Sequence, residues 1–211
     1  MIIFGSIGSR ASRCLWTAEE LGLTPEWQPI STLDGSNKSP DYLAINPSGK
    51  IPAMSDGEVV MTESMAINLY LAQNYGRGGL WPAELTGQAL ALQWTMWSVS
   101  EIEYYIGALF PQLVMKSPAE RDQPFVDRLL SEMLPKLGEV ERALANRDYL
   151  LGPFTLADIS VAVQTFTIVD RFGLSLAELP RVRAWTERCR ARPARRKVDA
   201  LAAAVKVKPS T

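Results

Sequence analysis

Residues 46–67 constrain the fold of this chain more than any other segment. They begin with turn residues from Asn46 to Lys50, pass through the Ile51-Pro52 step into two short apolar runs, and end at Thr62-Glu63-Ser64 before a helical pattern. This order predicts a turn, a hairpin and a helix start. An extended backbone edge and a helix N-terminus would then be neighbours, so the segment predicts a binding site as well as packing.

Length and charge exclude several classes of protein. The chain has 211 residues, 47% of them hydrophobic, and a formal net charge of -1. A membrane span needs roughly 18 to 20 consecutive apolar residues, which the sequence lacks, and we expect no signal peptide at its start. The near-neutral charge argues against nucleic acid as the main partner. We interpret the basic cluster Arg188 to Lys197 as a solvated helix face.

Histidine and cysteine usage narrows the possible chemistry. The chain has no histidine and only two cysteines, Cys14 and Cys189. Ser-His-Asp triads, Cys-His pairs and histidine-ligated zinc are therefore excluded, and two thiols cannot build a four-thiolate site. The wide spacing of the cysteines favours a reduced, cytoplasmic protein over a disulfide scaffold, and we expect no metal.

The first third of the chain alternates between strand and helix patterns. We predict strands at 1–4, 26–30, 51–54 and 59–61, with a tight turn at Asp56-Gly57, and helices at 9–23, 42–45 and 64–75. The pattern predicts a small α/β unit in which strands and helices share one core.

Strand signals nearly vanish after the glycine-rich segment Gly76 to Pro82. Helices are predicted at 88–114, 118–146, from Thr155 onward, 180–190 and 194–205, with Pro135 able to kink or break the second. Ser117-Pro118-Ala119-Glu120 and Thr155-Leu156-Ala157-Asp158 have the pattern of helix caps. We therefore predict an α/β domain at 1–76, a linker at 77–86 and an all-helical domain at 87–211.

The Ile51-Pro52 bond allows two interpretations. X-Pro bonds are the ones with an appreciable cis population, and a cis proline at a strand start would turn the N–H and C=O of Ile51 outward to pair with an extended peptide. Alternatively, Pro52 is an ordinary trans proline that opens an edge strand. The sequence leaves both open.

Glu63 and Ser64 sit where a helix begins. The free N–H groups of the first turn and the Ser64 hydroxyl favour a carboxylate, while Glu63 can pair with an ammonium group. Together they would suit the head of an amino acid. The alternative is plain helix capping.

Ser9 precedes the first predicted helix and is a candidate donor to a thiolate, with Ser6 and Ser12 as rivals. A hydrogen bond from a hydroxyl near helix N–H groups lowers the pKa of a thiol from its usual value of about 8.5. The alternative is an N-cap serine. Cys14 falls on the apolar side of the same helix, and we interpret it as a core residue.

Three segments carry a family resemblance: Asn46 to Pro52, Thr62 to Leu71 and Gly152 to Ser160. They resemble the cis-proline loop, the Glu-Ser motif with its helix, and the capping motif of cytosolic glutathione transferases, over nearly the whole chain. The resemblance implies a thioredoxin-like N-terminal domain, an all-helical C-terminal domain and a homodimer.

The resemblance also implies glutathione as co-substrate. By matching motif positions, Ile51, next to Pro52, would pair its backbone with the cysteinyl part of glutathione. Glu63 and Ser64 would hold the γ-glutamyl head, and Lys50 could approach the glycine carboxylate.

Subfamilies differ in the residue that activates the thiol. Tyrosine-type members carry a tyrosine after the first strand, which is absent from Phe4 to Ile7, whereas serine-type members have a serine followed four residues later by arginine, as Ser9 and Arg13 do. The resemblance is therefore to the serine type, bacterial-like, with Ser9 as the catalytic residue. Met65 stands where many serine-type enzymes have arginine, so one glutathione contact is absent.

The expected reaction is attack of the glutathione thiolate on a small hydrophobic electrophile bound between the domains, in a pocket drawing on Trp97, Tyr104 and Tyr105. These aromatic residues could instead belong to the interdomain or dimer core. Glutathione-dependent isomerisation, dehalogenation, ether cleavage or peroxide reduction would use the same glutathione site. A non-catalytic, transferase-like binding protein is the remaining alternative.

Overall fold

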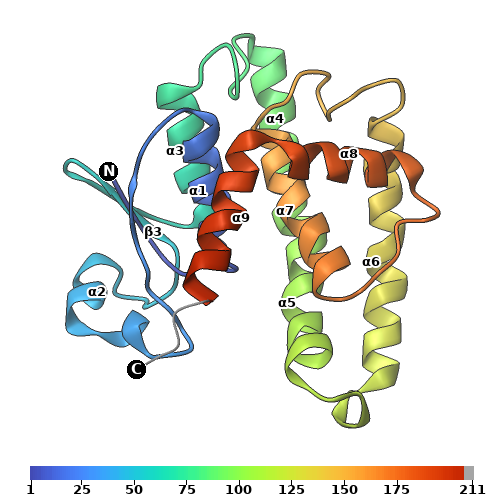
Figure 1. Ribbon diagram of the computed structural model, residues 1–211. Helices are drawn as coiled ribbons and strands as arrows, with labels where there is room; N and C mark the ends of the chain where they lie inside the picture. The colour runs from blue at the N-terminus through green and yellow to red at the C-terminus, as the bar shows by residue number, and fades with distance from the viewer. Residues whose placement is uncertain (207–211) are drawn as a thin grey trace. The chain divides into compact units, whose positions relative to one another are not determined.

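The computed structural model describes residues 1–206, which form two compact units (Figure 1). One unit contains Met1–Trp81 together with the described residues from Ala191 onward, and the other is Pro82–Arg190. The expected domain boundaries, 1–76 and 87–211, remain a prediction. They differ from the compact units chiefly at the last helix, α9 (Pro193–Lys206), which packs with the N-terminal unit.

The first unit is built around a four-stranded sheet with the strand order β2-β1-β3-β4. The strands are β1 (Ile2–Phe4), β2 (Glu26–Gln28), β3 (Ala53–Asp56) and β4 (Val59–Thr62). β1 pairs in parallel with β2 and antiparallel with β3, and β3 pairs antiparallel with β4. This mixed sheet confirms the predicted thioredoxin-like fold.

Helices α1 (Ala11–Glu20), α2 (Pro40–Ile45) and α3 (Ser64–Tyr75) accompany the sheet, with a 3-10 turn at Ser36–Lys38. α1 packs against α3 and also against α9. Two salt bridges join α1 to α9 and to the residue before it: Arg192 pairs with Glu20 at 2.6 Å, and Lys197 of α9 pairs with Glu19 at 3.0 Å.

The two faces of the sheet are distinguished by the alternation of side chains along β1 and β3. Phe4 and Ala53 form a buried cluster with Tyr42 of α2, and the rings of Phe4 and Tyr42 lie 6.2 Å apart. Ile3 and Met54, which point to the opposite face, are fully buried. Apolar residues therefore cover both faces, as expected for a sheet with helices on each side.

The second unit is helical. It comprises α4 (Leu85–Trp97), α5 (Tyr104–Phe110), α6 (Gln123–Ala143), α7 (Leu156–Asp170) and α8 (Pro180–Ala191). π-helical turns at Ser98–Glu103 and Pro111–Met115 flank α5, and a 3-10 turn lies at Pro118–Glu120. None of the described helices is long and apolar enough to cross a membrane.

Two predicted helices differ from the structure. The predicted helix at 88–114 is interrupted by the π-helical turns on either side of α5. The predicted start at Pro118 opens only a 3-10 turn, and α6 begins at Gln123 after its own cap, Asp122, which accepts from the Phe125 N–H at 3.1 Å.

Pro135 lies inside α6 and does not end it. Proline removes the hydrogen bond to the carbonyl four residues earlier, here that of Ser131. Both residues are exposed. Water can therefore solvate that carbonyl, which lowers the cost of the interruption.

The N-terminus of α7 has a closed capping box between Thr155 and Asp158. The Asp158 carboxylate is fully buried and accepts N–H groups from Leu150, Thr155 and the Trp185 indole, each at 2.9 Å. Burial raises the pKa of Asp158 to about 6, although these hydrogen bonds oppose the shift. Asp158 thus links α7 to α8 and to the loop before α7, and its role is structural.

Candidate functional site

Gly5 brings two of the predicted site segments together. It follows β1 with φ 144°, and a Cβ at this position would lie 2.7 Å from Ala11 Cβ and 3.5 Å from Ile51 Cβ. The backbone can approach this closely only because glycine has no side chain. The start of α1 and the Ile51-Pro52 step are therefore neighbours.

The Ile51-Pro52 bond is cis, the first of the two alternatives. Ile51 lies just outside the ladder of β3, whose first paired residue is Ala53. Among the described residues, no hydrogen bond engages the N–H or C=O of Ile51. Its backbone groups are thus available to an extended ligand.

Side chains from α2 and the preceding turn hold the loop before Ile51. The carbonyl of Lys50 accepts the Tyr42 hydroxyl at 2.6 Å and the Asn46 amide at 2.7 Å, while the Asn37 amide donates to the Gly49 carbonyl at 2.6 Å. Tyr42, Asn46 and Asn37 are all buried. They fix the loop from beneath and leave the Lys50 side chain exposed.

Glu63 has an unusual backbone for a non-glycine residue, with φ 66° and ψ 109°. Such conformations cost about 1 to 3 kcal/mol and are common at functional sites. Glu63 is the N-cap of α3, yet its side chain makes no capping hydrogen bond and is exposed. Plain capping therefore does not explain Glu63.

Ser64 is the first residue of α3 and is 5% exposed. Its hydroxyl accepts a long hydrogen bond from Arg13 Nη1 at 3.4 Å, and its carbonyl accepts the Cys14 thiol at 3.6 Å. These contacts join the start of α3 to α1. The buried Arg13 guanidinium places a positive charge beside the helix N-terminus, which further favours an anion there.

Cys14 is fully buried, as predicted for a core residue. Burial raises the pKa of its thiol to about 12, and the nearby Arg13 charge lowers it only in part. A thiol with so high a pKa is almost entirely protonated at neutral pH, so Cys14 is a poor nucleophile.

Of the three candidate serines, Ser6 and Ser9 lie between β1 and α1, and Ser12 is the second residue of α1. The partly buried Ser9 hydroxyl donates to the Ser6 carbonyl at 2.6 Å and accepts the Ala11 N–H at 3.1 Å. The Ser12 hydroxyl donates to the Ser9 carbonyl at 2.6 Å, and Ser12 is only 7% exposed. Ser9 can donate to a ligand if its hydroxyl turns away from Ser6.

Lys38 is a further cation near this site that the sequence did not single out. A Cβ on Gly49 would lie 2.6 Å from Lys38 Nζ, so Lys38 sits over the same loop as Lys50. No local motif marks Lys38, because its position depends on the Asn37–Gly49 hydrogen bond between distant segments.

The three predicted aromatic residues lie in the helical unit. The Trp97 indole donates to Glu139 of α6 at 3.0 Å, and Lys136 of α6 lies 5.9 Å from the centre of the Tyr105 ring. Tyr104 stacks edge-on against Tyr105 and is 63% exposed. Trp97 and Tyr105 are thus partly used in packing against α6, whereas Tyr104 is open to solvent.

The assembled site in the first unit suits a short, extended peptide with an anionic end. It offers the backbone of Ile51, the first turn of α3, the carboxylate of Glu63 and the exposed Lys50. In the part of the chain that the structure describes, no group of three or more acidic or thiol side chains could hold a metal ion.

The chain matches two family models, "Glutathione S-transferase, N-terminal domain" over residues 1–73 and "Glutathione S-transferase, C-terminal domain" over residues 101–193. It is 35% identical to glutathione S-transferase 3 of Zea mays, over 86% of this chain and 84% of the relative. It is 31% identical to glutathione S-transferase GstB of Escherichia coli K12, over 90% of this chain and 92% of the relative.

Among solved structures, the theta class glutathione S-transferase of Xanthomonas axonopodis pv. citri, determined with glutathione bound, superposes with a TM-score of 0.85. That protein is 32% identical to this chain, and the match covers 93% of this chain and 95% of the other. The similarity spans both units.

Proposed function

This chain belongs to the glutathione S-transferase family, and we propose that it joins the thiol of glutathione to a small hydrophobic electrophile. The observation that carries the proposal is the meeting of three segments in one unit: the start of α1, the cis Ile51-Pro52 step and the start of α3. Together they offer a matching partner for each part of a γ-glutamyl tripeptide.

Each part of glutathione has a proposed partner. The cysteinyl backbone pairs with the N–H and C=O of Ile51, and the α-carboxylate of the γ-glutamyl head lies against the first turn of α3 and the Ser64 hydroxyl. The ammonium group pairs with Glu63. The glycine carboxylate lies near the exposed ammonium groups of Lys50 and Lys38, both beside the Gly49 loop.

Ser9 is the proposed catalytic residue. Its hydroxyl turns from the Ser6 carbonyl to donate to the glutathione sulfur, while the Ala11 N–H continues to donate to the Ser9 oxygen and polarises it. The positive charge of Arg13 is buried in the same helix and also favours an anion. Both effects lower the pKa of the bound thiol.

The thiolate then attacks an electrophilic carbon, so a carbon–sulfur bond forms as a leaving group departs or a conjugated double bond accepts the electron pair. Orientation of the two reactants and stabilisation of the thiolate supply the rate enhancement. For the electrophile we propose aromatic contacts from the helical unit, with Tyr104 the most accessible of the three predicted residues.

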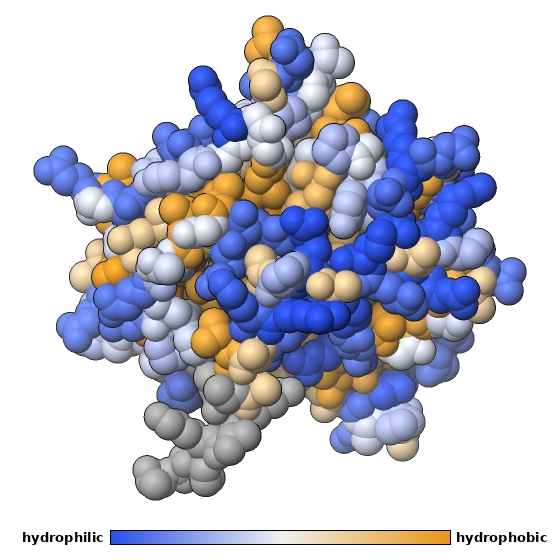
Figure 2. Space-filling view, turned by 45° about the horizontal axis from the view of Figure 1, so that its top comes forward, coloured by the Kyte–Doolittle hydropathy of each residue, from blue (hydrophilic) through white to orange (hydrophobic). Residues whose placement is uncertain are grey.

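A homodimer is proposed from the apolar side chains that α4 leaves exposed. Leu85, Leu92 and Met96 of α4, with Val99 in the π-helical turn that follows, are between 41% and 81% exposed, at helical spacings of seven, four and three residues. Hydrophobic side chains reach the surface in separate patches among hydrophilic ones (Figure 2). Exposed apolar side chains that follow one another along a helix suit contact with a second copy of the chain. A cytoplasmic location is also proposed, since both cysteines are free and buried.

The experiment that tests this function measures the pKa of glutathione bound to the wild type and to Ser9→Ala, from the ultraviolet absorbance of the thiolate. We expect a pKa well below the free value of about 8.5 in the wild type and a return of about one unit or more toward it in Ser9→Ala. Ser12→Ala is the matched control and should keep the wild-type pKa. An unchanged pKa in Ser9→Ala would contradict the assignment.

A further inference from the structure

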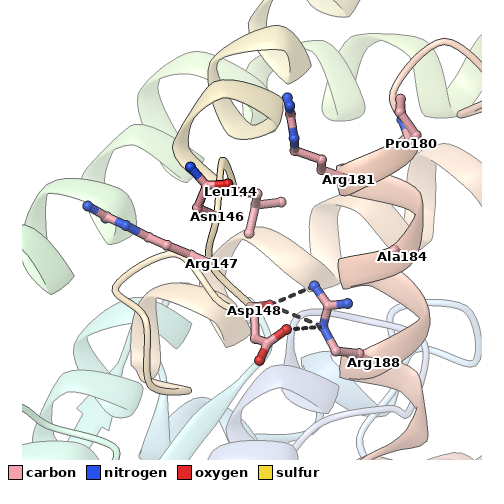
Figure 3. Close-up of a pocket in the computed structure, with 8 residues that line it drawn as sticks. All are labelled: Leu144, Asn146, Arg147, Asp148, Pro180, Arg181, Ala184 and Arg188. Atoms are coloured by element: carbon pink, nitrogen blue, oxygen red, sulfur yellow. Dashed lines mark hydrogen bonds and ion pairs between the residues drawn. The ribbon is translucent and has the colours of Figure 1, made fainter.

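A pocket of about 450 Å³ lies in the helical unit, and none of its lining residues is among those assigned to glutathione. It is bounded by the end of α6, the turn at 145–148 and residues 180–188 of α8 (Figure 3). Its volume is within the range of small-molecule sites.

Three arginines and one aspartate line this pocket, which gives the lining a formal charge of +2. Arg147 donates to the Leu150 carbonyl at 3.4 Å and, among the described residues, makes no ion pair. Arg188 donates to the Asp148 backbone carbonyl at 2.9 Å and 3.2 Å, but lies 3.9 Å from its carboxylate. Arg181 Nη1 lies 3.4 Å from the Glu141 carboxylate, so Arg147 is the lining arginine that keeps an unpaired charge among the described residues, and the positive charge is only partly neutralised.

The helix N-terminus of α8 does not account for an anion site here. Glu141 of α6 already accepts the N–H of Arg181 at 3.2 Å and that of Val182 at 2.9 Å. The side chain of Glu141 is 13% exposed, so this cap is largely shielded from solvent. An anion in the pocket would depend on the arginine side chains.

The pocket also has an apolar surface. Leu144 and Ala184 lie between the arginine side chains, and Pro180 closes the end nearest the start of α8 (Figure 3). Leu144 is 2% exposed and belongs to the core of the unit. Apolar contacts next to a few charged groups are typical of small-ligand sites.

We propose that this pocket binds a small phosphate ester. Guanidinium groups bind phosphate through paired N–H donors, and a phosphate monoester carries a charge near −2 with three acceptor oxygens, which suits a lining with excess positive charge. The Arg147 and Arg181 side chains extend away from one another (Figure 3), so both would turn inward to hold the phosphate, while its organic part lies over Leu144 and Ala184. Arg188 supports the turn through Asp148.

The test is a titration of the full chain with phenyl phosphate at low ionic strength, followed by amide chemical shifts. Saturable shifts should occur at 144–148 and 180–188. Arg147→Gln should weaken binding by about fivefold or more. Arg183→Gln is the matched control, because Arg183 is an exposed residue of α8 outside the pocket and removes the same charge. Its affinity should remain that of the wild type.

Two further titrations identify the ligand chemistry. Inorganic phosphate should bind at the same amides more weakly than phenyl phosphate, and benzyl alcohol should cause no saturable shift there. If inorganic phosphate bound as tightly as phenyl phosphate, the organic part would add nothing, and a phosphate ester would be wrong as the proposed ligand. Absence of saturation by phenyl phosphate, or equal losses in Arg147→Gln and Arg183→Gln, would overturn the proposal. These outcomes leave glutathione binding unaffected, because the shifts report on the helical unit alone.

Discussion

The N-termini of α7 and α3 show how similar sequence features serve different purposes. At α7, the capping box of Thr155 and Asp158 is closed and buried, and Asp158 accepts three N–H groups from the chain itself. At α3, the N-cap Glu63 is exposed, makes no capping hydrogen bond and has φ 66°. The N-terminus of α7 is capped by residues of the chain itself, whereas the N-terminus of α3 leaves polar groups available to a ligand.

The difference in capping between the two helix N-termini indicates which of them could bind a ligand. A helix N-terminus leaves several N–H groups without intrahelical partners, and a folded protein normally satisfies them with a cap or with water. A strained, uncapped terminus beside a buried arginine is better explained by a ligand that supplies the missing acceptor. Substitutions at the two termini should therefore separate stability from binding.

The largest effect is expected at α7. Asp158→Ala leaves the Trp185 indole N–H and two backbone N–H groups without their acceptor, and each buried orphan costs about 1 to 3 kcal/mol. We expect the free energy of unfolding to fall by about 4 kcal/mol, measured by urea denaturation.

Asp122→Ala is the control for this prediction, because Asp122 caps α6 at the surface through a single N–H. It should cost only about 1 kcal/mol. If both variants lost the same free energy of unfolding, burial of the α7 cap would not add to its stabilising effect.

The pH dependence of stability should also report on Asp158. Its pKa rises from 3.8 to about 6 on folding because of burial. A raised pKa in the folded state means that the contribution is complete below about pH 4 and is lost as the pH rises through about 6. Asp158→Asn has no carboxyl group at this position and should lack this pH dependence. The difference in free energy of unfolding between the wild type and Asp158→Asn should therefore shrink by about 3 kcal/mol between pH 4 and pH 7. A constant difference, measured by urea denaturation, would contradict it.

A smaller effect is expected at Glu63, where two substitutions separate strain from charge. Glu63→Gln keeps the Cβ and loses the charge, whereas Glu63→Gly also relieves the positive φ. Unfolding in urea should show Glu63→Gly to be more stable than Glu63→Gln by about 1 kcal/mol. Both should bind glutathione more weakly than the wild type. A glycine variant with wild-type affinity would remove Glu63 from the proposed site.

Much of this could be predicted from the sequence because the signals are local. The helix at 64–75, the turn at Asp56-Gly57 and the Thr155–Asp158 cap depend on residues within a few positions of one another, and the structure confirms them. Apolar periodicity likewise identified the strands, with boundaries displaced by one to a few residues.

Other features of the structure were not predicted from local sequence patterns. Apolar periodicity did not detect the π-helical turns around α5, although Pro111 opens the second of them. The sequence left open whether Pro135 kinks or breaks its helix, and the structure shows that the helix continues through this exposed residue. Lys38 joins the site only through the fold. The role of Ser9 stays a prediction, since its hydroxyl now donates to Ser6.

The most direct test of the central claim is calorimetric titration of reduced glutathione into the wild type, Ser64→Ala and the control Ser117→Ala. Ser117 stands at the start of the 3-10 turn at Pro118–Glu120 in the helical unit, where it forms a capping box with Glu120. We predict binding by the wild type and by Ser117→Ala, with a loss of about tenfold, or about 1.4 kcal/mol, in Ser64→Ala. No binding by the wild type, or equal affinity in all three, would contradict a glutathione site at the start of α3.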